Sequence, residues 1–315
     1  MRFGIYPGGA LGTADGTLLG DVPDDPAAAL TAIDALRAGA PFHVRAYARF
    51  HDQRSAGDTT TQAPTDVLAY TASGCRLDLV LQYQSARGDV SGYRRFVRTM
   101  IETYAAVLDT VQVGEEINVV DNPTLDGSYP AVLDAVVAGV AAARDAITQL
   151  GLDATVGTNT TVLFGDPGFF SRLTTLGGDA FRASLDHVGL DAFPDVFRPL
   201  PPGADTGAAC SWLLAEHRRL ALLPAGLDHL PLRLTEHGCP TGAGRGEARQ
   251  AELVGAMVTA VLDPTACVES YTHFSLRDAT DDDSLFGSFG LTDLRYQPKP
   301  AFGLYAETVQ AHAAR

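Results

Sequence analysis

The chain has 315 residues, of which 46% are hydrophobic, so it is long enough to bury a large core. Its 23 Lys and Arg residues against 38 Asp and Glu residues give a formal net charge of −15. Because phosphate groups are bound by basic patches, we expect neither nucleic acid nor an anionic membrane surface as a partner, whereas a neutral ligand is compatible with this charge.

No run of 18 apolar residues occurs, so the sequence predicts no membrane-spanning segment. The chain is strand-like directly after Met1, with no apolar leader and small-residue cleavage site before that stretch. We therefore expect a cytoplasmic protein, or a secreted one if a leader has been removed. The cysteines lack CxxC spacing and the histidines lack HxH or HExxH spacing, so we expect no metal and no other cofactor.

The pattern along the chain is a strand, a loop and a helix, repeated. The first apolar run, residues 3–6, is followed by Pro7-Gly8-Gly9 and a loop to about Pro23. These glycines match neither GxGxxG nor a P-loop and indicate a turn. Asp25 as the N-cap and Pro26 as the first helical residue then predict where the first helix begins.

Further apolar runs and helical patterns alternate through the rest of the chain. Strands are predicted at residues 42–50, 77–83, 111–118, 154–158, 187–192, 230–234 and 268–274. Helices are predicted at about 65–73, 92–107, 130–150, 169–176, 208–222 and 247–262, with a last helix from about Pro300. Eight strand–helix units without a clear linker predict an α/β fold, a single (β/α)8 TIM barrel over residues 1–315. A doubly wound sheet is the alternative, but it normally has a Gly-rich phosphate turn after its first strand, which this chain lacks.

Polar residues gather at the predicted carboxyl ends of the strands, where parallel barrels place their active sites. In the second strand, a period of two places Arg45 on one face with His43 and Tyr47, which indicates the lining of a pocket. Gln82 and Asn159 lie near the ends of the third and fifth strands.

Glutamates end the fourth and seventh strands, which face one another across the mouth of a barrel. The fourth strand ends in Gly114-Glu115-Glu116 and the seventh in Thr235-Glu236. If strand geometry persists, only one of Glu115 and Glu116 faces a given pocket. Two carboxylates that flank a sugar bond are the usual equipment of a glycosidase: one protonates the leaving oxygen and later activates water, while the other attacks the anomeric carbon. The acid requires a raised pKa and the nucleophile a low one, and Arg45 is a suitable cation to keep a nucleophile ionised.

Four segments resemble a known group of enzymes. Residues 111–118, VQVGEEIN, resemble the VQVGNEIN strand of family 53 glycoside hydrolases, the endo-β-1,4-galactanases, and more broadly the strand-four Asn-Glu motif of glycoside hydrolase clan A. Residues 234–240, LTEHGCP, resemble the strand-seven nucleophile motif of that clan, and residues 187–194, HVGLDAFP, resemble its strand-six motif. Residues 275–279 with 298–302 resemble the C-terminal end of several clan members.

The resemblance implies a retaining β-glycosidase that acts on a small-molecule or oligosaccharide glycoside, with Glu116 as the acid/base and Glu236 as the nucleophile. It also matches Arg45 to the strand-two arginine beside the nucleophile. The residues expected to contact the substrate are Arg45, Gln82, Glu115, Asn159, Phe193, His237 and His273.

Three positions depart from the clan's pattern. Glu115 replaces an asparagine that usually binds the sugar 2-hydroxyl, and a carboxylate can only accept hydrogen bonds where an amide also donates. Phe193 replaces a tyrosine that usually hydrogen-bonds the nucleophile. His273-Phe274 stands where many members place a tryptophan that stacks on the sugar.

These departures leave a second interpretation open. It is a clan-A-like barrel that binds a sugar or polyol without hydrolysing it, or that serves other acid–base chemistry. A structural or interaction protein and a metalloenzyme are weaker alternatives. The sequence does not predict the sugar, the linkage or whether cleavage is internal or terminal.

Overall fold

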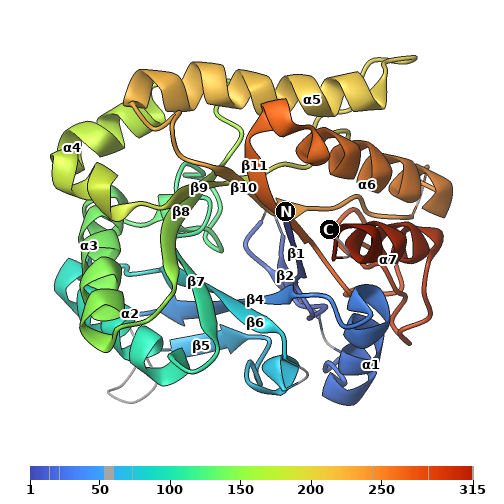
Figure 1. The fold of residues 1–315 in the computed structure, drawn as a ribbon, viewed down its shortest axis with the longest axis horizontal. Helices are drawn as coiled ribbons and strands as arrows, with labels where there is room; N and C mark the ends of the chain where they lie inside the picture. Colours follow the sequence, from blue (N-terminus) through green and yellow to red (C-terminus); the bar gives the residue numbers. More distant parts are fainter. Residues whose placement is uncertain are drawn as a thin grey trace.

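Eight parallel strands close into a barrel surrounded by helices (Figure 1). The computed structural model describes residues 1–13, 15–20, 22–52, 60–72, 74–242, 244–282 and 284–313. Strand β1 pairs with both β4 and β11, which closes the sheet and confirms the predicted (β/α)8 fold. The barrel strands are β1 (Arg2–Ile5), β4 (Phe42–Phe50), β6 (Arg76–Tyr83), β7 (Leu108–Val113), β8 (Thr155–Thr161), β9 (His187–Asp191), β10 (Leu232–His237) and β11 (Val268–His273).

The helices pack their apolar faces on the outside of the barrel. In the first of them, the side chain of Asp25 accepts hydrogen bonds from the backbone N–H groups of Ala27 and Ala28, at 2.9 and 3.1 Å, and Pro26 is the first helical residue, as predicted. The helices are α1 (Pro26–Arg37), α2 (Val90–Tyr104), α3 (Val132–Leu150), α4 (Phe169–Ser184), α5 (Thr206–His217), α6 (Glu247–Leu262) and α7 (Pro300–Ala313).

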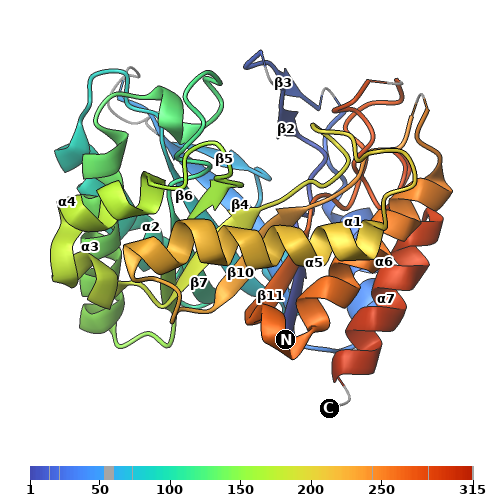
Figure 2. The same ribbon diagram turned by 90° about the horizontal axis from the view of Figure 1, so that it is seen from above.

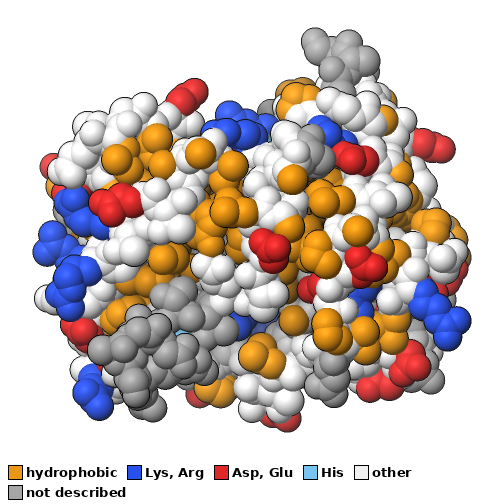
Figure 3. Space-filling view, turned by 90° about the horizontal axis from the view of Figure 1, so that it is seen from below, with side chains coloured by type: hydrophobic (Ala, Val, Ile, Leu, Met, Phe, Trp, Pro, Cys, Tyr) orange, Lys and Arg blue, Asp and Glu red, His pale blue; other side chains and the backbone are white. Residues whose placement is uncertain are grey.

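The connection between β4 and β6 differs from the prediction. Instead of a helix over residues 65–73, it contains β5 (Thr60–Ala63), antiparallel to β4, and a single 3-10 turn, η1 (Ala69–Thr71). A segment this short forms few helical hydrogen bonds, and a helix of that length is stable only when packing supports it. Figure 3 views the molecule from this side, with α1 also in front, and apolar side chains are scattered there among polar ones.

Helix α4 is longer than predicted but is interrupted close to the predicted end. Gly178 has non-helical backbone angles, φ 64° and ψ −159°, and the chain resumes a helical course to Ser184. The pair Gly177-Gly178 therefore interrupts the helix just after the predicted end at residue 176, and a second helical segment follows it.

The inside of the barrel is polar, whereas the outward-facing strand residues form the core with the helices. Arg45, Asp78, Gln112 and Arg233 are buried, and the apolar residues that alternate with them, such as Leu79, belong to the hydrophobic core. A small hairpin of β2 (Leu11–Gly12) and β3 (Leu18–Leu19) stands at the carboxyl end of the strands (Figure 2). Among the described residues, none of the helices combines the length and apolar character that crossing a membrane requires.

Candidate active site

A cavity of about 700 Å³ opens at the carboxyl ends of the barrel strands. Glu115, Glu116 and Glu236 all line it, so the glutamates that end β7 and β10 face the same space. Its size lies within the range typical of small-molecule binding sites. Tyr47 and Gln82, from β4 and β6, line it as well.

The turn after β7 turns both glutamates toward the cavity. The strand ends at Val113, and Gly114 adopts φ +83°, where an added Cβ would lie 2.5 Å from Ile117. Glu116 also has a positive φ, of 41°. Because the chain leaves strand geometry here, the alternation that would have sent one glutamate away from the pocket no longer applies.

Asp126 holds this turn in place. Its buried Oδ2 accepts hydrogen bonds from the backbone N–H groups of Glu115, at 2.9 Å, and Tyr83, at 2.7 Å. In addition, the backbone N–H of Glu116 donates to Oδ1 of Asn159 at 2.9 Å. The positions of both glutamates are therefore fixed by Asp126, from the loop that follows β7, and by Asn159, from the neighbouring strand β8.

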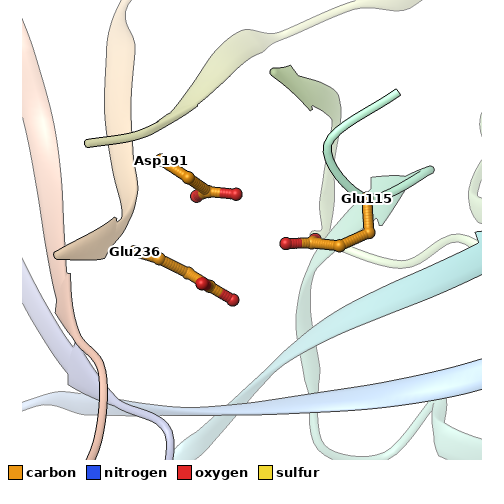
Figure 4. Close-up of side chains that lie close together, drawn as sticks. All are labelled: Glu115, Asp191 and Glu236. Carbon is orange, nitrogen blue, oxygen red and sulfur yellow. The ribbon is translucent and has the colours of Figure 1, made fainter. Parts of the chain in front are cut away.

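Three carboxylates point toward one another beneath the cavity (Figure 4). Glu115 comes from the turn after β7, Asp191 from the end of β9 and Glu236 from β10, and one oxygen of each lies within 4.8 Å of the others. Asp191 was not among the predicted site residues. The sequence could have indicated it, because Asp191 is an acidic residue at the end of the sixth strand, and the same feature identified the two glutamates.

Arg45 lies buried among these acids. Its guanidinium donates to Asp78 at 2.8 Å and to Glu115 at 3.1 Å, and its Nε lies 3.7 Å from Oε1 of Glu236. The same Nε donates to the hydroxyl oxygen of Tyr47 at 2.9 Å, and that hydroxyl donates to Glu236. Tyr47 therefore supplies the hydroxyl contact that Phe193 cannot make, from β4 rather than from β9.

Each of the three carboxylates accepts at least one hydrogen bond within the protein. Asp191 accepts from the Thr235 hydroxyl at 2.6 Å and also from the side-chain amide of Asn159. Glu115 accepts from Arg45 and Gln112, and Glu236 from Tyr47. Each of the three residues has one oxygen placed where a cation could be bound, but a cation would compete with these hydrogen-bond donors for the carboxylates.

Burial and mutual repulsion raise the pKa values of the acids in this cluster. Burial, with the charge of Glu115 second, raises the pKa of Glu116 to about 8. The same two causes raise the pKa of Glu236 well above its ordinary value, against the lowering effects of Arg45 and the Tyr47 hydrogen bond. Burial also raises the pKa of Asp191. Like charges this close do not all ionise together, so the cluster retains protons near neutral pH.

The barrel is similar to those of several glycoside hydrolases. It matches a glucosidase from Croceicoccus marinus with a TM-score of 0.66 and 14% identity, covering 98% of this chain and 70% of that one. A family 39 glycoside hydrolase from Bacteroides cellulosilyticus WH2 gives 0.64 and 14%, covering 98% and 63%. A fungal β-1,4-galactanase gives 0.63 and 9%, covering 98% and 99%.

At 9–14% identity these likenesses establish the fold alone. The resemblance to family 53 is therefore distant, because the galactanase shares only 9% of its residues with this chain. This chain spans less than two thirds of the family 39 enzyme. No protein-family model and no curated protein sequence matches the chain.

The structure places the predicted substrate contacts at three different depths. Gln82, Glu115 and Phe193 line the cavity itself. Arg45 and Asn159 are fully buried beneath it and hold the carboxylates through hydrogen bonds.

The prediction that His237 and His273 contact the substrate is wrong, because neither residue lines the cavity. Both rings are buried on the outer side of the barrel, where Nδ1 of each lies within hydrogen-bond distance of the Tyr271 hydroxyl, at 2.8 and 3.3 Å. The His273 ring also packs 5.9 Å from that of Tyr305 in α7.

An irregularity in β10 explains the place of His237. The pairing of β10 with β9 shifts register between Leu234 and Glu236, so two successive side chains point into the barrel. Thr235 donates a hydrogen bond to Asp191, and an oxygen of Glu236 lies within 4.8 Å of oxygens of Asp191 and Glu115. Such a bulge re-aims the side chains that follow it, and His237 turns outward.

The exposed aromatic residues Trp212 and Phe197 line the cavity and were not predicted to be in the site. Trp212 lies on α5, as predicted for a helical residue, yet its side chain lines the cavity next to Phe164, with ring centroids 5.1 Å apart. Phe197 lines the cavity from the loop after β9. Both side chains are more than half exposed, at 57% and 52%. Exposed aromatic residues on a helix and a loop carry no sequence period, so only the folded arrangement identifies them.

Proposed function

We propose that this protein is a retaining β-glycosidase, with Glu116 as the acid/base and Glu236 as the nucleophile. The proposal rests on one observation above all: the glutamates that end β7 and β10 line the same cavity, and Glu236 is held there by Tyr47 and Arg45. The raised pKa of Glu116 supports its assignment as the acid, because a general acid must be protonated near neutral pH.

In the first step, the carboxylate of Glu236 forms a bond to the anomeric carbon while the glycosidic carbon–oxygen bond breaks. Glu116 gives its proton to the leaving oxygen, which departs as an alcohol. In the second step, Glu116 takes a proton from water as the water oxygen attacks the anomeric carbon, and Glu236 is released as a carboxylate. Each step conserves charge, and the two steps together return the enzyme to its starting state.

The ionised form of Glu236 requires stabilisation against burial. Arg45 provides a guanidinium 3.7 Å away, and the Tyr47 hydroxyl donates a hydrogen bond to the same oxygen. Both groups favour the charged form, which is the form that attacks. Burial and the charge of Glu115 nevertheless leave the pKa of Glu236 well above its ordinary value, whereas a low pKa was expected for the nucleophile. Asn159 and Asp126 act as positioning residues, because they hold the backbone that carries Glu116 and Glu115.

The test is hydrolysis of a panel of aryl β-glycosides (galactoside, glucoside, xyloside, mannoside and arabinoside) by the native protein and by Glu236→Gln. We expect at least one substrate to be cleaved, and we expect the variant to lose at least about a thousandfold in kcat. Glu247→Gln, an exposed glutamate at the start of α6, is the matched control and should keep full activity. No cleavage of any substrate by the folded native protein would contradict the proposal.

A second candidate is a barrel that binds a sugar or polyol without hydrolysing it. It is favoured by the two additional acids around Arg45, since Glu115 and Asp78 share the guanidinium with Glu236. Calorimetric binding of monosaccharides together with an inactive glycoside panel would support this candidate.

A further inference from the structure

The cavity above the carboxylates has two different walls. Polar side chains from β4, β6 and the loop after β7, including Arg49, Gln82 and Asn122, form one wall. The loops after β8, β9 and β11, together with α5, form the other, which is predominantly apolar and includes Phe164, Phe193, Phe197, Trp212 and Phe286.

The aromatic side chains of the apolar wall pack against one another and still present a wide surface. The ring of Phe197 lies 5.6 Å from that of Phe193 and 5.9 Å from that of Phe286. Trp212 and Phe197 remain more than half exposed although each is large and apolar. Covering such side chains with an apolar group is favourable by roughly 25 cal/mol for each Å² removed from water.

The polar side chains on the apolar wall are few, namely Thr161, Asp195 and the exposed Arg198, and the first two already have partners within the described structure. Asp195 is paired with Arg249 at 2.6 Å and also accepts the backbone N–H of Leu200. The Thr161 hydroxyl donates to the backbone carbonyl of Asp191 at 3.1 Å. Apart from Arg198, this wall offers few hydrogen-bond partners to the hydroxyl groups that an oligosaccharide would bury on it, and burying an unpaired hydroxyl group is costly.

The volume of the cavity also exceeds what one sugar ring requires. At about 700 Å³ it is in the range that encloses a drug-sized molecule. A sugar over the carboxylates and the polar wall leaves the space beside the apolar wall for the group bonded to the anomeric oxygen.

We propose that the substrate is a monosaccharide joined to an apolar, ring-containing alcohol, and that Trp212 and Phe197 bind this alcohol portion. This inference rests on the proposed glycosidase function and names its leaving group. It assigns the polar wall to the sugar and the apolar wall to the aglycone. An oligosaccharide that stacks a second sugar ring on Trp212 and Phe197 is the competing substrate, and the experiment compares the two.

The chain contains a built-in reporter for this site, because Trp212 is its single tryptophan. The experiment is a fluorescence titration of the native protein with menthol, an apolar alicyclic alcohol that does not absorb the exciting light, and in parallel with lactose. We expect menthol to change the Trp212 emission saturably, with a Kd on the order of 1 mM or lower. Lactose should bind at least tenfold more weakly.

Two variants separate the aromatic wall from general apolar adsorption. Phe197→Ala removes a wall residue whose ring contacts Phe193 and Phe286, away from the ring that packs on Trp212, and should raise the Kd for menthol by roughly fivefold. Leu223→Ala removes an equally exposed apolar side chain that does not line the cavity, and should leave the Kd unchanged.

The outcomes distinguish this inference from the proposed function. An emission that does not respond to menthol up to its solubility limit, or tighter binding of lactose, would overturn the apolar aglycone even if aryl glycosides are hydrolysed. An equal effect of Phe197→Ala and Leu223→Ala would also overturn it. Saturable binding that is weakened by Phe197→Ala alone supports the site, and an inactive glycoside panel would then contradict only the hydrolysis.

Discussion

Glu115 determines the electrostatics of the site at the scale of single residues. It is buried, it shares Arg45 with Asp78 and Glu236, and its charge is one cause of the raised pKa values of Glu116 and Glu236. A neutral amide at this position would relieve that repulsion. The carboxylate here is therefore a means of keeping the neighbouring acid protonated at a higher pH than its burial alone would achieve.

Glu115→Gln should move the alkaline limb of activity to lower pH. Glu116 must be protonated to act as an acid, so kcat/KM is expected to fall above its pKa of about 8 in the native protein. Removing the neighbouring charge lowers that pKa, and the fall should begin earlier. The measurement is a pH profile of kcat/KM on the best aryl glycoside, with Glu247→Gln as the control. An unmoved limb would show that Glu115 does not act on Glu116 through its charge.

Tyr47 and Asp191 show which site residues the sequence makes accessible. Period two in the second strand placed Tyr47 beside Arg45 on the inner face, which the structure confirms through its hydrogen bond from Arg45. Asp191 ends its strand as the two glutamates end theirs, but its contact with them depends on the closure of the barrel. Contacts between the side chains of β7, β9 and β10 are non-local, and no local sequence pattern encodes them.

At the scale of elements, the turn after β7 depends on one buried carboxylate. Asp126→Ala leaves the backbone N–H groups of Tyr83 and Glu115 without their partner. An unpaired buried donor costs about 1 to 3 kcal/mol, so for two donors we expect the free energy of unfolding to fall by roughly 2 to 6 kcal/mol. Urea denaturation measures this change.

The control for this variant is Asp121→Ala, an exposed residue in the same loop. It should change the free energy of unfolding by less than about 0.5 kcal/mol. If the two variants are equally stable, the hydrogen bonds of Asp126 do not hold the turn.

Local backbone irregularities account for the differences between the predicted and observed positions of several site residues. The strand pattern of β10 was predicted, but the register shift before Glu236 was not, and this shift turns His237 outward. The turn at Gly114 similarly brings both Glu115 and Glu116 to the cavity. Bulges and positive-φ turns depend on the strands that pair with a segment. The alternation of apolar and polar residues within that segment therefore does not predict them.

At the scale of the whole molecule, the stability should depend on pH in a direction set by buried groups. In the unfolded chain, Glu116 returns to its ordinary pKa of 4.5, whereas burial and Glu115 raise the folded value to about 8. The pKa values of Asp126, Asp191 and Glu236 are also raised by burial. Above pH 4.5 the folded state therefore binds more protons at these carboxyls than the unfolded chain, and their contribution to stability decreases as pH rises.

Buried histidines act in the opposite direction at lower pH. Burial lowers their pKa values below the ordinary 6.5, so their contribution increases as pH rises toward 6.5 and is then complete; they are His187, His217, His237 and His273. Between pH 6.5 and 8 the carboxyls dominate, and we expect the free energy of unfolding to fall. Urea denaturation at pH 6.5 and pH 8 checks this, and Glu116→Gln should reduce the fall. A rise over this interval would contradict the assignment.

The barrel itself was predictable because its signals are repeated and local. Alternating apolar runs and helical periods recur along the chain, and one misassigned segment, between β4 and β6, does not change the closure. The cavity was only partly predictable. Residues at strand ends were found, whereas Trp212 and Phe197 meet at the cavity only because α5 and the loop after β9 lie over it.

The most direct test of the account is the trapping of the glycosyl–enzyme intermediate. The protein is incubated with 2,4-dinitrophenyl 2-deoxy-2-fluoro-β-glycosides of the sugars in the panel, and its intact mass and proteolytic peptides are measured by mass spectrometry. We expect a single added glycosyl group on the peptide that contains Glu236, and none in Glu236→Gln. An adduct on Glu115 or Asp191 instead, or turnover of the matching glycoside without any adduct, would contradict the assignment of Glu236 as the nucleophile.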